Sequence, residues 1–144
     1  MKIVDLTILG KPFGKQRPRV TTKGEYAVAY TPKETVSYEN LIKMTFQEKY
    51  GNEFEIIDFP MYVKIIAYFG MPKSFSEKTK SLALLNKIRP GKNPDADNIA
   101  KVVLDALNKI AYTDDKLVVD LVVRKFYAVN PRVEIVIQKA KEIE

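Results

Sequence analysis

Hydrophobic and polar residues alternate along several stretches of the chain, and this period of two is typical of half-buried β-strands. Residues 2–9 (KIVDLTIL) and 61–69 (MYVKIIAYF) predict two strands of this kind. Residues 117–128 and 132–139 predict two more, joined around Asn130-Pro131 as a hairpin. The chain is therefore expected to contain about four main strands.

Helical periodicity marks two further segments, each preceded by a pattern that favours a helix start. The stretch Thr31–Glu34 (TPKE) reads as a capping box with proline at the first helical position, and it predicts a helix over about 32–49. The stretch Ser74–Glu77 (SFSE) reads as a second capping box, and it predicts a helix that continues to about Ile88.

A third helix is expected over about 98–110, with Asp95 or Asp97 as its cap. Residues 10–30 are rich in glycine and proline, which predicts a long loop or a loose hairpin around Thr22-Lys23-Gly24. Three helices and about four strands in 144 residues, without repeats or a linker, predict one compact domain over 1–144. The expected fold class is α/β (α+β), with a mixed β-sheet.

The composition excludes several kinds of chemistry, because the chain has no His and no Cys. It therefore contains no His-ligated or thiolate zinc site, no Ser-His-Asp triad and no cysteine nucleophile. Any hydrolysis has to use carboxylates, lysine, tyrosine, hydroxyls or a metal-activated water. Carboxylates favour hard cations such as Mg²⁺, with Mn²⁺ as a substitute.

The net charge of +6 and the isoelectric point near 9.4 indicate an anionic partner, nucleic acid before membrane. No apolar run reaches the length of about 18 residues that a membrane span needs. The N-terminal stretch MKIVDLTILGK is too short and too polar at Asp5 for a signal peptide. We therefore expect a cytoplasmic protein without a membrane partner.

Two carboxylates stand two residues apart directly after a proline-terminated loop, at Asp95 and Asp97. They can converge on one cation if the backbone between them is extended or turning into a helix. Lys101 follows Asp97 by one helical turn, so both can face the same side. The competing interpretation is helix capping, but a cap needs only one of the two carboxylates.

A second acidic pair, Asp114-Asp115, lies between the third helix and the strand that starts near Leu117. A solvated turn is the competing interpretation. The two acidic pairs reinforce each other, because a hard-cation site takes carboxylates from more than one segment.

Basic residues concentrate near the N-terminus, and from 10 to 33 they outnumber the single acidic residue, Glu25. Such side chains on a Gly/Pro-rich segment suit phosphate contacts, and the tyrosines that follow can stack on exposed bases. The alternative is a solvated basic surface. The candidate DNA-binding residues are Lys11, Lys15, Arg17, Arg19 and Lys23, followed by Tyr26 and Tyr30.

The run PDADNIAKVVLDALNKIAYTDDKLVVDL resembles the signature of the RusA family of Holliday-junction resolvases. The hallmarks of that family are an Asp-x-Asp-Asn-x-x-Lys segment, a following Asp-Ala-Leu and a later Asp-Asp pair. The segment KPFGKQRPR, followed by Tyr30-Thr31-Pro32, is also similar to the N-terminal region of the family's Gram-positive and prophage branch. The likeness covers most of the chain and is sharpest from 94 to about 127.

The resemblance implies a homodimeric, Mg²⁺-dependent endonuclease that cuts four-way DNA junctions symmetrically in recombination and repair. It places the first two catalytic, metal-binding aspartates at Asp95 and Asp97 and the catalytic lysine at Lys101. The third catalytic and metal-binding aspartate falls on Asp115. The spacing from Asp97 to the acidic pair is about one residue shorter than in the best-known family member, so Asp114 stays the alternative ligand. Whether one or two ions bind is left open.

The distance between the acidic pairs bears on how such a site is assembled. A helix over 98–110 carries the chain about 20 Å from Asp97, and residues 111–114 retrace at most about 14 Å. Asp115 can join Asp97 within one subunit only if the helix ends early, for instance near Asn108. Otherwise Asp115 completes the site of the partner subunit. A dimer could use the Leu117–Val123 stretch, which is apolar on both faces.

Two other functions remain as alternatives. A carboxylate-metal phosphohydrolase acting on nucleotides would not need the basic segment. The other alternative is a non-catalytic nucleic-acid-binding module, in which the aspartates only cap a helix or stabilise a turn. Such a module would bind junctions without Mg²⁺-dependent cleavage.

Overall fold

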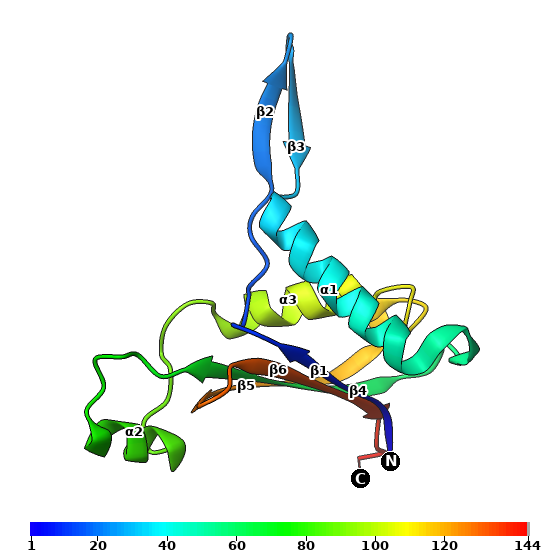
Figure 1. Ribbon diagram of the computed structural model, residues 1–144. Helices are drawn as coiled ribbons and strands as arrows, with labels where there is room; N and C mark the ends of the chain where they lie inside the picture. Colours follow the sequence, from blue (N-terminus) through cyan, green and yellow to red (C-terminus); the bar gives the residue numbers. More distant parts are fainter. Residues whose placement is uncertain (144) are drawn as a thin grey trace.

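A four-stranded mixed sheet forms the body of the protein in a computed structural model that describes residues 1–143 (Figure 1). Strands β4 and β5 run parallel, and the other neighbours run antiparallel. Across the sheet the order is β1 (Lys2–Leu9), β6 (Arg132–Lys139), β4 (Met61–Gly70) and β5 (Val118–Ala128). The predicted α+β class with a mixed sheet is confirmed.

Strand β4 shows why the alternating pattern specifies this sheet. Its odd-numbered residues from Met61 to Phe69 are buried, and the residues between them are only half-buried. The predicted hairpin around Asn130-Pro131 is wrong, because β4 lies between β5 and β6 and pairs with both. Alternation reports which face of a strand is buried, but it does not report which strand is the neighbour.

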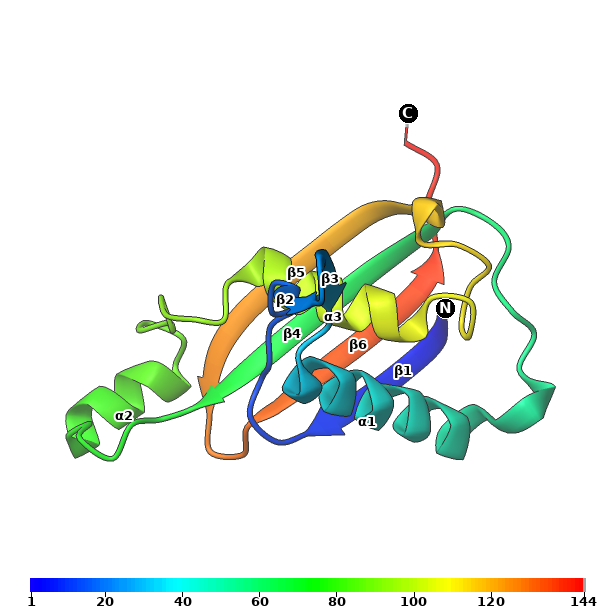
Figure 2. The same cartoon turned by 90° about the horizontal axis from the view of Figure 1, so that it is seen from above.

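Helices α1 (Lys33–Tyr50) and α3 (Ala96–Leu107) lie on one side of the sheet, whereas α2 (Glu77–Leu84) lies beyond the end of β4 (Figures 1 and 2). Burying each aliphatic side chain of α3 stabilises the fold by roughly 1.5–3 kcal/mol. The buried residues of α3 are Ile99, Ala100, Val102, Val103, Ala106 and Leu107. This apolar face leaves the opposite side of α3 free for polar residues.

The helix starts differ in detail from the predictions. At α1 the cap position is occupied by Pro32, which provides no side-chain capping hydrogen bond, so the predicted capping box does not form. At α2 the cap is Ser76, whose hydroxyl accepts a hydrogen bond from the amide of Thr79. That helix ends at Leu84 and not near Ile88.

Helix α3 starts and ends two to three residues earlier than predicted. Asn108 is extended, and Lys109 adopts the left-handed conformation with φ of 65°, which turns the chain away from the helix axis. Burial of Ala111 and Tyr112 then favours this early exit over a further helical turn. The alternative of an early helix end is therefore the one that the structure adopts.

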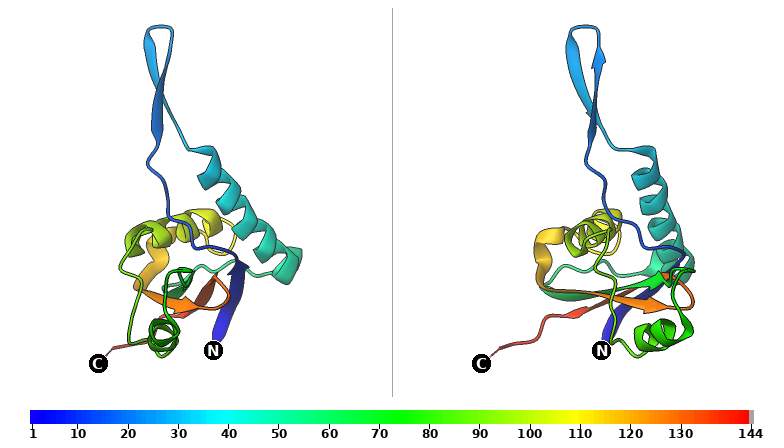
Figure 3. Two further views of the ribbon diagram at one scale, coloured as in Figure 1. Left: turned by 60° about the vertical axis from the view of Figure 1, so that its left-hand side comes forward. Right: turned by 90° about the vertical axis from the view of Figure 1, so that its left-hand side faces the viewer.

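Strands β2 (Arg19–Lys23) and β3 (Tyr26–Tyr30) form a separate two-stranded arm that projects away from the body (Figure 3). All ten strand residues are exposed, and Gly24 supplies the left-handed φ of 65° at the turn. The predicted loose hairpin is confirmed. Because an isolated two-stranded hairpin is at best marginally stable in water, an external contact is expected to order this arm further.

The parallel connection from β4 to β5 contains α2, α3 and the short 3₁₀ helix η2 (Asp115–Leu117); another, η1 (Gly51–Glu53), follows α1. Both acidic pairs therefore lie in this one connection. Within residues 1–143 no helix is long and apolar enough to cross a membrane.

Candidate active site and nucleic-acid interface

The first acidic pair lies at the N-terminus of α3. Asp95 occupies the cap position, but its carboxylate makes no capping hydrogen bond and instead accepts one of 3.0 Å from the side-chain amide of Asn98. This hydrogen bond, together with the positive charge of Lys125, holds the pKa of Asp95 below its usual value. Asp95 is thus ionised at neutral pH, as a metal ligand has to be. Helix capping does not explain this carboxylate.

Polar residues at four-residue spacing form the exposed ridge of α3. Lys101 lies 3.9 Å from the carboxylate of Asp97, and both side chains are more than 60% exposed, at 63% and 67%. Asp105 continues the ridge one turn further. The predicted catalytic lysine therefore lies beside the predicted ligand Asp97, and both face solvent.

The second acidic pair divides into two different roles. Asp114 caps η2, because its carboxylate accepts a hydrogen bond of 2.9 Å from the amide of Lys116. Asp115 is exposed and is the first residue of η2, so it is not the cap. Partial desolvation and the nearby charges of Asp114 and Asp105 raise the pKa of Asp115. Such a raised pKa marks a carboxylate that gains from a neighbouring cation.

The structure does not bring all three predicted ligands together in one subunit. Asp105, which is close enough to Asp115 to affect its pKa, lies about 12 Å along the helix from Asp97, at about 1.5 Å per residue. Among residues 1–143 no three acidic side chains are placed to hold one metal ion. The pair Asp95 and Asp97 nevertheless fits Mg²⁺, which commonly takes one or two carboxylates and fills its shell with water and substrate phosphate.

Two neighbours of the acidic pair were missed by the sequence analysis. Lys125 on β5 lowers the pKa of Asp95 by its charge, although the two residues are far apart in the chain. Asn98 donates to Asp95 at the short spacing expected within a first helical turn, so its role was readable from the sequence. The position of Lys125 was not, because it depends on the register of β5 against β4.

The arm presents two chemically different faces. Directly opposite residues of an antiparallel pair share a face, and the register pairs Arg19 with Tyr30 and Lys23 with Tyr26. Both basic residues predicted for the arm therefore lie beside an exposed tyrosine. The opposite face carries only the small uncharged residues Val20, Thr22, Ala27 and Ala29.

The remaining predicted DNA-binding residues differ in their environments; they are Lys11, Lys15 and Arg17. Lys11 and Arg17 are exposed. Lys15 is only 22% exposed and forms ion pairs with Glu39 at 3.2 Å and with Asp105 at 3.1 Å. Burial alone lowers the pKa of Lys15, but its bonds to Asp105 and Glu39 outweigh burial and raise it. This lysine joins the arm's base to α1 and α3.

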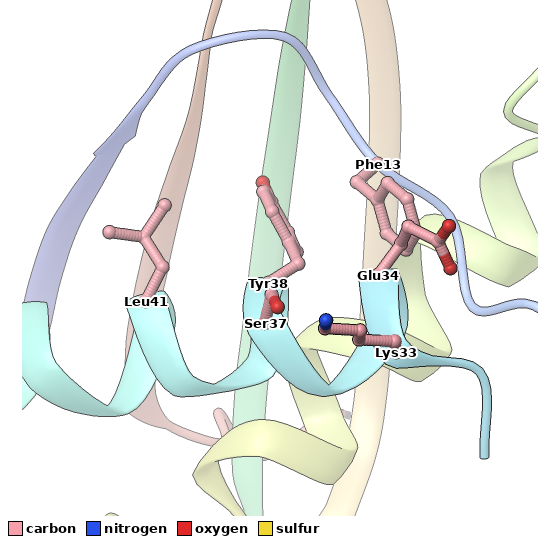
Figure 4. A pocket seen from close by; sticks show the side chains of 6 residues that line it. All are labelled: Phe13, Lys33, Glu34, Ser37, Tyr38 and Leu41. Carbon is pink, nitrogen blue, oxygen red and sulfur yellow. The ribbon is translucent and has the colours of Figure 1, made fainter.

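A pocket at the base of the arm lies between α1 and the segment that follows β1 (Figure 4). Phe13 and Tyr38 line it, with ring centroids 5.3 Å apart, and burial raises the pKa of Tyr38 to about 12. Its only charged lining residues are Lys33 and Glu34. Without a carboxylate pair this pocket does not suit metal-dependent hydrolysis, and the chemical site is the open ridge of α3.

The protein thus combines an α+β domain with an exposed carboxylate pair and a basic two-stranded arm. The family model "Endodeoxyribonuclease RusA" matches residues 10–138 of the chain. The protein therefore belongs to the RusA endodeoxyribonuclease family. Resolution of Holliday junctions is the nuclease activity that this family suggests.

A relative in Bacillus subtilis (strain 168), described as "Uncharacterized protein YqaN", is 34% identical to the chain over 141 residues. The similarity covers 96% of this chain and 98% of that protein. The similarity thus extends over nearly the whole length of both proteins.

Proposed function

We propose that the chain is a Mg²⁺-dependent endodeoxyribonuclease that resolves four-way DNA junctions by paired symmetric nicks, in recombination and repair. The observation that carries this proposal is the pair Asp95 and Asp97, exposed at the start of α3 beside Lys101. Endodeoxyribonuclease RusA is the family to which the chain belongs, and this pair lies in the region matched.

The carboxylates of Asp95 and Asp97 would hold the cation, and Asp115 would complete the ligand set. Bound there, Mg²⁺ supplies Lewis-acid activation of water and neutralisation of phosphate charge, and Mn²⁺ can substitute. Lys101 stabilises the negative charge that develops on the scissile phosphate or positions the attacking water. The capping role of Asp114 favours Asp115 as the third ligand.

The arm contacts the DNA in this proposal. Arg19 and Lys23 bind backbone phosphates, and the tyrosines beside them stack on bases that are unpaired at the branch point. Lys11 and Arg17, both exposed, add phosphate contacts nearer the body. The ion pairs of Lys15 make it a support for the arm.

A homodimer supplies two sites related by a two-fold axis, as paired symmetric nicks require. Strand β5 is an edge of the sheet, and its residues Val119 and Leu121 are 57% and 46% exposed. Asp115 lies directly before this strand. An interface along the β5 edge would place Asp115 near the partner subunit, which supports completion of each site in trans.

The proposal is tested by incubating the pure protein with a labelled synthetic four-way junction, with Mg²⁺, with Mn²⁺ and with a chelator. Symmetric nicks are expected only with a cation. Matched linear duplexes and free nucleotides serve as competing substrates. Phosphate release from nucleotides would favour the phosphohydrolase alternative, and junction binding without any cleavage would favour the non-catalytic binding module.

A further inference from the structure

Helices α1 and α3 cover one side of the sheet (Figures 1 and 3), and the register of the strands puts a row of basic and aromatic residues on its other side. Arg132 on β6, Tyr68 on β4 and Phe126 on β5 are direct neighbours across three strands, so their side chains share one face. In the next row Arg124 on β5 lies opposite Ile66. We call Arg89, Arg124, Arg132, Tyr68 and Phe126 the arginine–aromatic cluster.

Three guanidinium groups lie over the two rings of this cluster. The guanidinium carbons of Arg89 and Arg124 are 4.4 and 5.1 Å from the ring centroid of Phe126. That of Arg132 is 4.0 Å from the centroid of Tyr68, and the two rings are 6.1 Å apart. Contact with a ring face orients a guanidinium plane and reduces the entropy that is lost when it binds a ligand.

The positive charges of the cluster are only partly neutralised. Arg132 pairs with Glu134 at 2.9 Å. Within residues 1–143 neither Arg89 nor Arg124 has a carboxylate at ion-pair distance. Because both lie over the same ring, their charges are no more than about 10 Å apart, within the range of repulsion in about 0.1 M salt. An anion bound to both guanidinium groups would relieve that repulsion.

The free hydrogen-bond donors indicate the chemistry of this anion. Nε of Arg89 donates to the backbone carbonyl of Lys125 at 3.1 Å, which leaves its terminal nitrogens unused. A planar guanidinium with free terminal N–H groups binds phosphate through two parallel hydrogen bonds. Arg89 and Arg124 contact a ring, and no salt bridge involves either of them within residues 1–143, so their guanidinium N–H groups remain available to such a ligand.

The cluster lies close to the acidic pair through the chain and through β5. Arg89 begins the loop 89–94 that leads to Asp95. Lys125, between Arg124 and Phe126 in sequence, points to the opposite side of β5, where its charge lowers the pKa of Asp95. Because residues 89–94 join the cluster directly to Asp95, one duplex of the branched DNA can contact the cluster and the acidic pair together.

We propose that the arginine–aromatic cluster is a second DNA contact, in which Arg89 and Arg124 bind the phosphodiester backbone of a duplex arm. This inference rests on the proposed function, because it takes branched DNA as the substrate. It assigns phosphate binding to residues on the face of the sheet that is opposite α1 and α3, away from the protruding β2–β3 hairpin. The contact is with backbone phosphate, so it is independent of DNA sequence.

The double variant Arg89→Gln/Arg124→Gln tests the assignment. Binding of a labelled four-way junction is measured without divalent cations at several KCl concentrations, so that cleavage does not enter. Loss of two phosphate contacts is expected to reduce the slope of log K against log salt by about 2 and to weaken binding in about 0.1 M salt by about tenfold for each contact. Arg124→Gln alone leaves Arg89 on Phe126, and it is expected to reduce the slope by about 1.

Lys64→Gln is the matched control, because Lys64 lies on the same face of β4, two residues from Ile66 and outside the cluster. Its salt slope is expected to stay at the wild-type value. An equal loss in Lys64→Gln would show a general effect of charge and overturn the assignment. A wild-type slope in both arginine variants, with a wild-type protein that binds and cuts junctions, would overturn this inference alone. A wild-type protein that binds no DNA would overturn the proposed function as well.

Discussion

Lys15 lies 3.1 Å from the carboxylate of Asp105, and this ion pair joins the segment that leads into the arm to the helix that begins with the acidic pair. Glu39 on α1 holds the same ammonium at 3.2 Å. Three separate segments therefore meet at one lysine. Movement of the arm on DNA is expected to be transmitted to α3 through this contact.

Replacement of Lys15 by Met should lower the free energy of unfolding by about 1–3 kcal/mol, because Glu39 and Asp105 lose their shared partner. Urea denaturation measures this loss. Lys11→Met removes the same charge from an exposed position and should change stability by no more than about 0.5 kcal/mol. Equal effects of the two substitutions would contradict a supporting role for Lys15.

The same ion pairs predict a dependence of stability on pH. The folded pKa of Lys15 is raised above 10.5, so its stabilising contribution is complete below pH 10.5 and is lost as the pH rises through the folded value. The thermal midpoint of the wild type should therefore approach that of Lys15→Met above pH 10.5. A difference between the two proteins that stays constant through this range would refute the linkage.

Replacement of Asp95, Asp97 or Asp115 by Asn should reduce junction cleavage by more than about 100-fold, because each removes a ligand charge while almost keeping the shape. Junction binding should persist or tighten, since negative charge near the phosphates is lost. Asp114→Asn is the control, because the Asn carbonyl can still accept from the amide of Lys116. Near wild-type cleavage by Asp97→Asn would end the metal-site assignment.

Mixing the inactive Asp97→Asn and Asp115→Asn proteins, with subunit exchange, tests where the third ligand comes from. If Asp115 acts in trans, half of the sites in a mixed dimer regain a full ligand set and nicking returns. If Asp115 acts in cis, every site still lacks one ligand and the mixture is inactive. A protein that sediments as a monomer and still resolves junctions would contradict the dimer itself.

The two faces of the arm should differ in their importance for DNA. Arg19→Ala and Lys23→Ala should each reduce the salt slope of junction binding by about 1. Tyr26→Ala/Tyr30→Ala should reduce the preference for a junction over a linear duplex, because stacking on unpaired bases is lost. Thr22→Ala, on the opposite face, should leave both quantities unchanged. An equal effect of Thr22→Ala would indicate that the arm is a solvated surface without specific DNA contacts.

Most of the elements were readable from the sequence because local patterns set them. Alternation along β4 and the apolar face of α3 located a strand and a helix, whose ends the structure moves by up to three residues. The order of the strands was not readable, because β4 enters between β5 and β6 only through contacts far apart in the chain. Strand order is a tertiary property.

The candidate site was predictable to a similar extent. The spacing of Asp95, Asp97 and Lys101 places them on one helix start, where the structure has them. The ion pairs of Lys15 and the arginine–aromatic cluster were not predictable, because their members come from different elements. The choice between Asp114 and Asp115 needed a hydrogen bond that only the folded chain shows.

The position of β6 between β1 and β4 links nuclease chemistry to the order of synthesis. The ribosome makes residues 132–139 after every candidate catalytic residue, yet this segment is a central strand of the sheet on which α3 rests. The sheet cannot close around its core before that strand arrives, and pairings so distant in sequence form slowly. A nascent chain therefore carries all its candidate catalytic residues before the sheet beneath α3 can be completed.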